Sequence, residues 1–179
     1  EAKRRRLGPA AFSTNVPGGR CEACAGRGVV RVPMDLLPDV TVGCEACSGR
    51  RFSDDVLACR LGGRSITDLL DAPVSDAASW LASKAALAAP LAALLDLGLG
   101  YLRVGQEGAT LSSGERQRLR LACLLAAPRR DRVALLLDEP TRGLGLDDVD
   151  RLLSALGLLA DEGHLVVLVE HHPAVLAAH

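Results

Sequence analysis

The sequence has 179 residues, of which 49% are hydrophobic and 24% are charged, and its formal net charge is −1. This length and apolar content allow one or two domains with a buried core, and the small net charge excludes a strong overall attraction to nucleic acid or membranes. Aromatic residues make up only 2% of the chain, which disfavours binding of nucleic-acid bases by stacking. The charge is uneven, with +4 over residues 1–64 and −5 over the remainder.

No run of about 18 apolar residues and no signal peptide occurs, so the sequence predicts a cytoplasmic protein without a membrane partner. In that compartment, paired cysteines favour a metal site over disulfides. The two Cys-x-x-Cys pairs are separated by 19 residues and consist of Cys21, Cys24, Cys44 and Cys47. Two turns that each present two thiolates complete a tetrahedron, which predicts a structural zinc ion with no open coordination position. A redox dithiol would need only one pair.

The segments between the two cysteine pairs, residues 28–33 and 39–43, have β character and predict a short ribbon. Cys59 and Cys123 stand alone in the sequence and are expected to be small buried hydrophobic residues.

Arginines are frequent around the predicted zinc site and could contact phosphates of DNA. The candidates for DNA contact are Arg20, Arg27, Arg31, Arg50 and Arg51. A solvated surface explains these arginines equally well. The basic run at residues 3–6 is more simply explained as a solvated surface than as a phosphate contact.

Two families share parts of this region. The segment from Cys21 to Gly28 resembles the CxxCxGxG repeat of the DnaJ-type chaperone zinc domain, but Arg51 replaces the last glycine of the second copy. A longer pattern resembles the carboxy-terminal zinc module of the UvrA family, damage-sensing ATPases of bacterial nucleotide excision repair. This pattern comprises Phe12-Ser13-x-Asn15-Val16-x-Gly18-Gly19-Arg20-Cys21-Glu22-x-Cys24, Met34-x-x-Leu37-Pro38-Asp39-Val40 and Cys44-Glu45-x-Cys47.

Residues 65–110 are expected to form a helical connection whose apolar side chains pack in the core. Residues 87–97 carry alanine and leucine at helical spacing, and Pro90 is expected to start this helix rather than interrupt it.

A further helix is predicted to begin in the octapeptide Leu111-Ser112-Ser113-Gly114-Glu115-Arg116-Gln117-Arg118. Ser112 followed three residues later by Glu115 predicts a capping box. The same helix start offers backbone N–H groups to an anion. The segment resembles the ABC-ATPase signature in its UvrA form, LSGGExQR, which implies nucleotide binding by Leu111 to Glu115. Ser113 replaces the first glycine of that motif, and its β-carbon could crowd a bound phosphate.

Residues 133–137 are an uninterrupted apolar run, which predicts a strand buried on both faces of a parallel sheet. Asp138 and Glu139 follow this strand at the edge where open α/β sheets bind their ligands. The natural roles in a phosphoryl transfer are Mg²⁺ binding by Asp138 and orientation of the attacking water by Glu139. A simple turn after the strand is the alternative interpretation.

Residues 143–148 resemble the D-loop of the family, which implies nucleotide contact by Asp147, and Asp147 could also cap the next helix. Residues 165–169 form a second apolar run that predicts a strand ending at Glu170. The resemblance implies that His171 is the switch histidine, whose imidazole contacts the γ-phosphate and positions the attacking water. His172, which stands where the family usually has Asn, is assigned no role.

Together these patterns predict an α/β fold, namely a partial ABC-ATPase domain with a largely parallel sheet and a small Cys₄ zinc module. The predicted parts are a basic entry with the zinc module (residues 1–64), the helical connection (65–110) and the later part of the ATPase domain (111–179). The P-loop motif GxxxxGK[ST] does not occur, and the resemblance places it upstream of Glu1. The chain is therefore expected to be an excerpt of a longer protein and to hydrolyse no ATP alone.

The resemblance implies a DNA-damage-recognition ATPase of nucleotide excision repair that couples ATP binding and hydrolysis to DNA binding. The implied cofactors are Zn²⁺, Mg²⁺ and ATP, and the implied partners are duplex DNA, a UvrB-type helicase subunit and a second copy of the protein in a homodimer. Two alternatives remain open at this point. One is a UvrA-like drug-resistance paralogue that acts on a DNA-binding compound, and the other is a zinc-ribbon interaction module with a degenerate ATPase.

Overall fold

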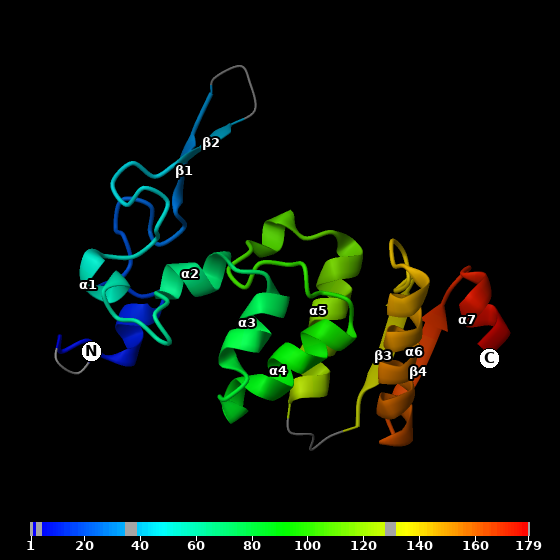
Figure 1. Cartoon of the computed structure of the whole chain (residues 1–179). Helices are drawn as coiled ribbons and strands as arrows, with labels where there is room; N and C mark the ends of the chain where they lie inside the picture. Colours follow the sequence, from blue (N-terminus) through cyan, green and yellow to red (C-terminus); the bar gives the residue numbers. More distant parts are fainter. Residues whose placement is uncertain (1, 3–4, 35–38, 128–131, 179) are drawn as a thin grey trace. The chain divides into compact units, whose positions relative to one another are not determined.

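The computed structural model describes residues 2, 5–34, 39–127 and 132–178, which form two compact units, residues 1–71 and 72–179 (Figure 1). The elements of the first unit are a 3₁₀ helix Pro9–Phe12, β1 Val29–Val32, β2 Val40–Gly43, α1 Asp54–Leu57 and α2 Ile66–Asp71. Those of the second unit are α3 Val74–Leu81, α4 Ala85–Asp96, a 3₁₀ helix Gly108–Thr110, α5 Ser113–Ala126, β3 Ala134–Asp138, α6 Leu146–Asp161, β4 Leu165–Val169 and α7 Pro173–Ala178.

The predicted ribbon of the first unit is confirmed. β1 and β2 pair antiparallel, with Val29 opposite Gly43 and Val32 opposite Val40. A separate small core follows the second cysteine pair, where Phe52 and Val56 are almost completely buried against Ile66 of α2. The hydroxyl of Thr67 donates to the carbonyl of Arg50 at 2.6 Å, so α2 is anchored directly to the turn that carries the second cysteine pair.

The second unit begins with α3, α4 and α5, in which α4 packs against both α3 and α5. A longer connection, residues 97–112, joins α4 to α5 and contains the 3₁₀ helix Gly108–Thr110. The prediction that Pro90 starts a helix is wrong, because Pro90 lies inside α4, which begins at Ala85. Proline has no N–H to donate to the preceding turn. The strong helix propensity of the surrounding alanine and leucine residues, together with packing against α3 and α5, offsets this loss.

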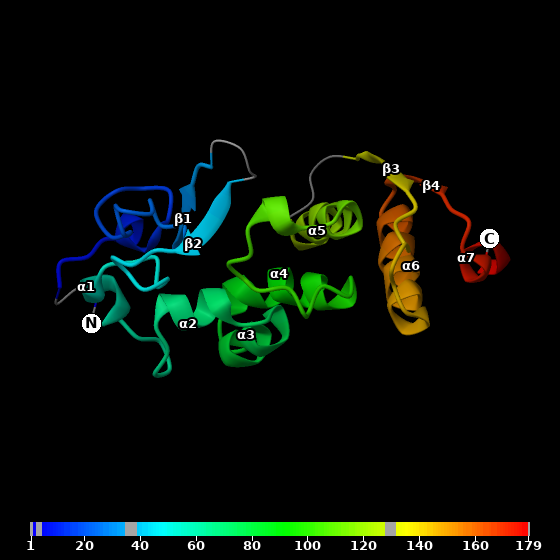
Figure 2. The same ribbon diagram turned by 90° about the horizontal axis from the view of Figure 1, so that it is seen from above.

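β3 and β4 form the predicted parallel pair and are joined by α6, which lies along one face of the two strands (Figure 2). Apolar residues at helical spacing on α6, Leu152, Leu156 and Leu159, are buried in the same core cluster as Leu137 of β3, and Val149 on the first turns of α6 is also buried. α6 ends at Asp161 with Glu162 as its C-cap, and the following Gly163 has a φ of +87°, which is readily adopted only by glycine. The imidazole Nδ1 of His164 then accepts a hydrogen bond from the Val133 N–H at 3.1 Å.

The prediction that the strand at residues 133–137 is buried on both faces is wrong, and the paired strand β4 is likewise covered on one face only. In the described residues, only one face of β3 and β4 is covered, by α6 and the adjoining core. Side chains alternate between the two faces of a strand. Leu136 is therefore 76% exposed and Leu165 is 61% exposed, whereas Leu137 is 5% exposed.

No helix within the described ranges is long and apolar enough to cross a membrane. The finer predicted division of the chain at residues 64 and 110 stays a prediction. Part of the basic run at Lys3 and Arg4, and the Leu37-Pro38 part of the family pattern, lie outside the described residues.

Adjacent leucines of β3 provide a test of this one-sided burial. We expect Leu137→Ala to lower the free energy of unfolding by about 2–4 kcal/mol, because it leaves a cavity in the core. Leu136→Ala should cost less than about 0.5 kcal/mol, because the leucine side chain is largely solvent-exposed. Denaturant unfolding of the chain measures both values, and equal losses for the two variants would contradict one-sided burial.

Candidate functional site

The four predicted metal ligands converge in the first unit. Their sulfur atoms lie within 4.8 Å of one another, and three of the four cysteines, Cys24, Cys44 and Cys47, are buried. The Cys21–Cys44 and Cys24–Cys47 sulfur separations are 3.9 and 3.8 Å. A tetrahedron with metal–sulfur bonds of about 2.3 Å has edges of about 3.8 Å, so the cluster has the size of a Zn²⁺ site. In the described part of the chain, no other group of three or more potential ligands converges in this way.

The two cysteine turns have nearly the same backbone. Ala25 and Ser48, at equivalent positions, both have a φ of +49°. The Gly28 N–H donates to the Cys24 sulfur at 3.2 Å, and the equivalent Arg51 N–H donates to the Cys47 sulfur at 3.4 Å. Hydrogen bonds of this kind stabilise thiolate ligands.

Arg51, where the sequence pattern departs from glycine, keeps the glycine backbone. Its φ is +72°, close to the +79° of Gly28. Its side chain is partly buried and donates to Asp71 of α2 at 3.4 Å. A side chain at Gly28 would collide with the carbonyl of Gly49 at 2.7 Å and with the side chain of Arg51 at 3.0 Å. Thus the first turn requires glycine, whereas the second turn tolerates an arginine that ties it to α2.

The titration of the cysteines also reflects their proximity. Burial opposes ionisation of Cys24, but the Gly28 N–H and the neighbouring thiols lower its pKa to about 7. Burial raises the pKa of Cys47 to about 12, with the neighbouring thiols adding to this effect against the Arg51 N–H. Four thiols this close cannot all ionise unless a cation compensates their charge.

Most of the arginines proposed for DNA contact are paired within the first unit. Arg20 pairs with Glu22 at 3.4 Å, Arg31 with Asp39 at 2.7 Å, Arg50 with Asp54 at 2.9 Å and Arg51 with Asp71 at 3.4 Å. Arg27 makes no ion pair with the described residues, and its Nε donates to the carbonyl of Cys24 at 3.4 Å. Its terminal nitrogens are therefore the most available of the five candidates.

The two remaining cysteines are less buried than expected. Cys123 is exposed on α5, and Cys59 is partly buried, with its thiol donating to the Asp55 carbonyl at 3.6 Å. Cys123 is exposed because it follows Leu121 and Ala122, two buried residues of α5, and so lies off the buried face of the helix.

The predicted capping box at the start of α5 is confirmed. The Glu115 N–H donates to the Ser112 hydroxyl at 3.2 Å, and the Ser112 N–H donates to the Glu115 carboxylate at 2.6 Å. The Tyr101 hydroxyl donates to the other carboxylate oxygen at 2.6 Å, and this bond together with the Ser112 N–H lowers the pKa of Glu115. Leu111 is buried, whereas Ser113 is exposed at the first position of the helix. The nucleotide-binding roles of residues 111–115 stay predictions.

The predicted acidic residues and the predicted histidine follow adjacent strands. Asp138 lies beside Val169, and the Glu139 N–H donates to the Val169 carbonyl at 2.8 Å, so the loops after β3 and β4 begin side by side. Glu139 has a φ of +45°, which is unusual for a residue other than glycine and is often found at functional sites. Its carboxylate pairs with Arg142 at 3.3 Å. His171 and Asp138 are exposed.

Asp147 is exposed in the first turn of α6. The prediction that Asp147 caps this helix is wrong, because the N-cap residue is Gly145 and no side chain caps it. The D-loop role of Asp147 stays a prediction.

Glu170 is a residue of this region that the sequence analysis left without a role. Its Oε1 accepts from both the N–H and the hydroxyl of Thr141, at 2.8 and 2.6 Å, and its Oε2 accepts from the N–H groups of His171 and His172, at 3.0 and 3.3 Å. One carboxylate thus joins the loop after β3 to the loop after β4. The sequence signal that could have identified Glu170 is the position of its carboxylate between an apolar strand and the predicted switch histidine.

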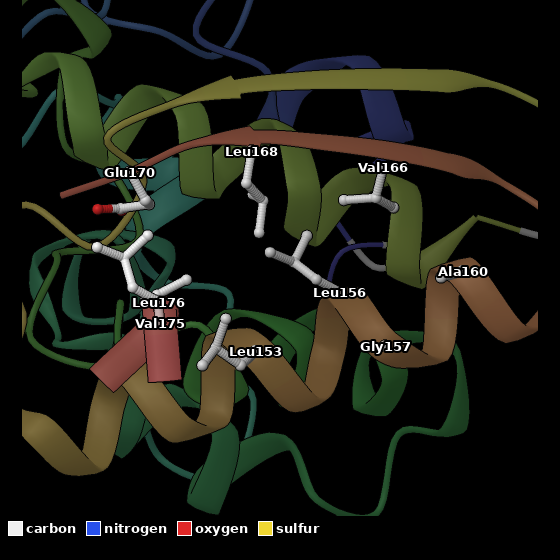
Figure 3. A pocket seen from close by; sticks show the side chains of 9 residues that line it. All are labelled: Leu153, Leu156, Gly157, Ala160, Val166, Leu168, Glu170, Val175 and Leu176. Atoms are coloured by element: carbon white, nitrogen blue, oxygen red, sulfur yellow. The ribbon is translucent and has the colours of Figure 1, made fainter. Parts of the chain in front are cut away.

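A cavity of about 430 Å³ lies between α6, β4 and α7 (Figure 3). It is lined by Leu153, Leu156, Gly157, Ala160, Val166, Leu168, Glu170, Val175 and Leu176. In Figure 3, Glu170 lies at one end, and the rest of the lining is apolar. The only charged group among the lining residues is the Glu170 carboxylate, which would repel a phosphate rather than bind it.

These features define the class of the protein. In the sequence, a helix with a capped Ser-Ser-Gly-Glu start is followed by two parallel strands, the first leading into Asp138-Glu139 and the second into Glu170-His171. This order is typical of the later part of an ABC-type ATPase domain. The Cys₄ cluster adds to this class a module whose four sulfur atoms could hold a metal ion.

No protein-family model matches the chain. The chain is 46% identical over 172 residues, 96% of its length, to UvrABC system protein A of Thermus thermophilus, and 45% identical over 176 residues to that of Agrobacterium fabrum. It also superposes with a TM-score of 0.88 and 42% identity, over 99% of its length, on the crystal structure of UvrA2 from Deinococcus radiodurans. The chain spans about a fifth of the length of these proteins, namely 18% of the two relatives and 22% of the solved chain. Over this segment the chain belongs to the UvrA family.

Removal of one cysteine ligand tests the metal site. We expect the chain to bind one Zn²⁺ through its four thiolates, and Cys47→Ser to lose most of that zinc and unfold residues 1–71, because metal binding and folding are coupled. Zinc content by mass spectrometry under native conditions and amide exchange of residues 1–71 measure the two effects. Cys59→Ser is the matched control and should keep its zinc; a full zinc load in Cys47→Ser would contradict the assignment.

The carboxylate of Glu170 predicts a pH-dependent stability. Burial opposes its ionisation, but the hydrogen bonds from Thr141, His171 and His172 outweigh burial and lower the pKa of Glu170. Its contribution is therefore complete above the ordinary glutamate pKa and is lost as the pH falls through the lowered value. We expect Glu170→Gln to cost roughly 1–2 kcal/mol at pH 7 and progressively less below about pH 4.

Thermal unfolding of the chain between pH 7 and pH 3 measures this difference. Glu107→Gln, an exposed position at the start of a 3₁₀ helix, serves as the control and should follow the unsubstituted chain throughout. A Glu170→Gln deficit that stays constant down to pH 3 would show that the carboxylate charge is not its source.

Proposed function

We propose that this chain is part of a DNA-damage-recognition ATPase of bacterial nucleotide excision repair, which couples ATP binding and hydrolysis to DNA binding. The observation that carries the proposal is that Glu139 and His171 follow the adjacent ends of two paired parallel strands, within a segment 46% identical to UvrABC system protein A. The identity extends over 96% of the chain, including both the Cys₄ module and the ATPase motifs. This supports the repair function over a drug-resistance paralogue or a bare interaction module.

In the proposed reaction, each acidic residue has a separate role. Asp138 would hold Mg²⁺, for which a carboxylate oxygen is a suitable ligand. When bound, this ion would neutralise part of the phosphate charge. Glu139 orients the attacking water and accepts its proton as general base. The side chain of Arg142, 3.3 Å from the Glu139 carboxylate, holds it beside the strand end. The His171 imidazole positions the water from the neighbouring strand.

The amino-terminal end of α5 is proposed to bind the phosphates of ATP. Its capping box occupies the Glu115 N–H, while the N–H groups of Ser113 and Gly114 at the first helical positions remain directed toward an anion. Ser113 supplies a hydroxyl where the family motif has glycine. By resemblance, residues 111–115 and Asp147 act on a nucleotide held by another ATPase domain, and Asp138, Glu139 and His171 act on the nucleotide of their own P-loop.

The Cys₄ module is proposed to hold Zn²⁺ as a structural ion, because four thiolates at tetrahedral spacing leave no position for a substrate. Among its arginines, Arg27 is the best candidate for a DNA phosphate. The pairs of Arg31 and Arg50 with aspartates are largely exposed, so these arginines can exchange a carboxylate for a phosphate at little cost. Arg20 and Arg51, whose side chains are mostly buried, are proposed to position the module.

The proposed assembly of the complete protein is a homodimer that works in the cytoplasm on duplex DNA with a UvrB-type helicase subunit. The DNA contact would depend on phosphates and on the deformability of the duplex rather than on base sequence. The chain by itself is proposed to be inactive as an ATPase, because it contains no P-loop motif.

Replacement of Glu139 in the full-length protein tests this proposal. We expect Glu139→Gln to reduce the rate of ATP hydrolysis by about 10²–10⁴-fold, because the amide cannot accept the proton of water. Nucleotide binding should be retained, and the preference for lesion-bearing over undamaged duplex should no longer change during incubation with ATP. Glu107→Gln is the matched control. Hydrolysis and lesion preference that are both unaffected by Glu139→Gln would refute the assignment.

A further inference from the structure

The side chain of Gln117 connects the helix that begins with the signature motif to the strand that ends with the metal-ligand carboxylate. With the amide assigned so that donors face acceptors, its Nε2 donates to the backbone carbonyl of Asp138 at 3.2 Å, and its Oε1 accepts from the backbone N–H of Asp138 at 3.1 Å. We propose that Gln117 is a positioning residue through which the nucleotide site at the start of α5 and the Asp138 site affect one another. This inference rests on the proposed function.

The pairing pattern of the sheet explains why Asp138 accepts this contact. In a parallel pair, the backbone groups of successive residues point alternately toward the partner strand and away from it. The Glu139 N–H points to β4 and donates to Val169, so the N–H and carbonyl of Asp138 point to the opposite edge of β3. Gln117 satisfies both groups there, as a further strand would.

The position of Gln117 on α5 makes the connection short and stiff. Gln117 lies four residues after Ser113, one turn further along the same face of α5. The next turn of this face carries Leu121, which is 1% exposed and packs in the core cluster that contains Leu137 of β3. A displacement of the signature end of α5 is therefore transmitted to the Asp138 backbone rather than absorbed by a flexible loop.

The neighbouring residue on α5, Arg118, has buried hydrogen-bond donors that are not satisfied. Arg118 is 3% exposed, and its Nε and Nη1 have no hydrogen-bond partner among the described residues. Its Nη1 and the carbonyl of Arg142, in the loop that follows Glu139, lie 3.9 and 3.7 Å from the point that a β-carbon on Gly114 would occupy. Two N–H groups of a buried guanidinium that lack acceptors are costly.

The consequence is communication between two nucleotide sites. If the signature end of α5 serves the nucleotide of one ATPase domain and Asp138 serves that of its own domain, Gln117 links the two sites within one chain. Binding at one site then biases the position of Asp138 at the other, and by linkage the reverse also holds. Gln117 touches neither nucleotide, so it acts through the Asp138 backbone.

The test replaces Gln117 in the full-length protein and has two readouts. Without nucleotide, Gln117→Leu should raise the amide exchange rate of Asp138 at least tenfold, because its N–H loses an acceptor. In steady-state ATP hydrolysis, the same variant should lower kcat at least tenfold and change KM less than threefold, because ATP still binds but the Asp138 carboxylate is displaced.

Gln117→Glu is the conservative variant, since it has the same length and keeps an acceptor for the Asp138 N–H while losing the donor to the carbonyl. We expect its effects on exchange and kcat to be intermediate, which keeps the test usable if Gln117→Leu folds poorly. Gln106→Leu, which removes an exposed glutamine amide that bonds only within its own turn, is the matched control and should leave both readouts unchanged.

The outcomes separate this inference from the proposed function. Faster Asp138 exchange with a lowered kcat and an unchanged melting temperature supports the inference. Unchanged exchange and kcat in both Gln117 variants would overturn it, as would a parallel loss of kcat and melting temperature, which a purely structural role produces. If the unsubstituted protein hydrolyses no ATP, the proposed function fails, and the Asp138 exchange rate still decides whether Gln117 fixes this backbone.

Discussion

The parallel register of β3 and β4 is the constraint on which the candidate ATPase site depends. It sets Asp138 beside Val169, so that the loops after the two strands start at the same edge. Glu170 then bonds both loops through a single carboxylate, and Gln117 attaches the edge of β3 to α5. Residues from three stretches of sequence that are separated along the chain thereby become parts of one site.

The first unit depends on a different kind of constraint. A two-stranded ribbon is marginal by itself, and the apolar core around Phe52 and Val56 is small. Four sulfur atoms within 4.8 Å provide the missing cohesion once a metal compensates their charge. The two cysteine turns repeat the same backbone, and their difference at Gly28 and Arg51 gives the second turn its attachment to α2.

Several local features were predictable because they depend on short-range geometry. The capping box of Ser112 and Glu115, the ribbon between the cysteine pairs and the helix end at Gly163 each follow from residues a few positions apart. The predicted strand ends also lie side by side, because a strand–helix–strand unit favours parallel pairing. Features that depend on the surroundings were not predictable. The apolar run of β3 gave no indication that Leu136 is exposed, and the interior position of Pro90 depends on packing against neighbouring helices.

By itself, the sequence determined the metal ligands that converge, the capped helix and the order of the ATPase motifs, because spacing, residue type and hydrophobic periodicity act over one or two turns of chain. Only the tertiary structure decided that Glu170 joins two loops, that Gln117 serves the backbone of Asp138, and which arginines are paired. The Glu170–Thr141, Gln117–Asp138 and Arg51–Asp71 contacts join residues 20 or more positions apart. The energetic need that they meet, a backbone group or charge without a partner, exists only after the strands and helices have packed.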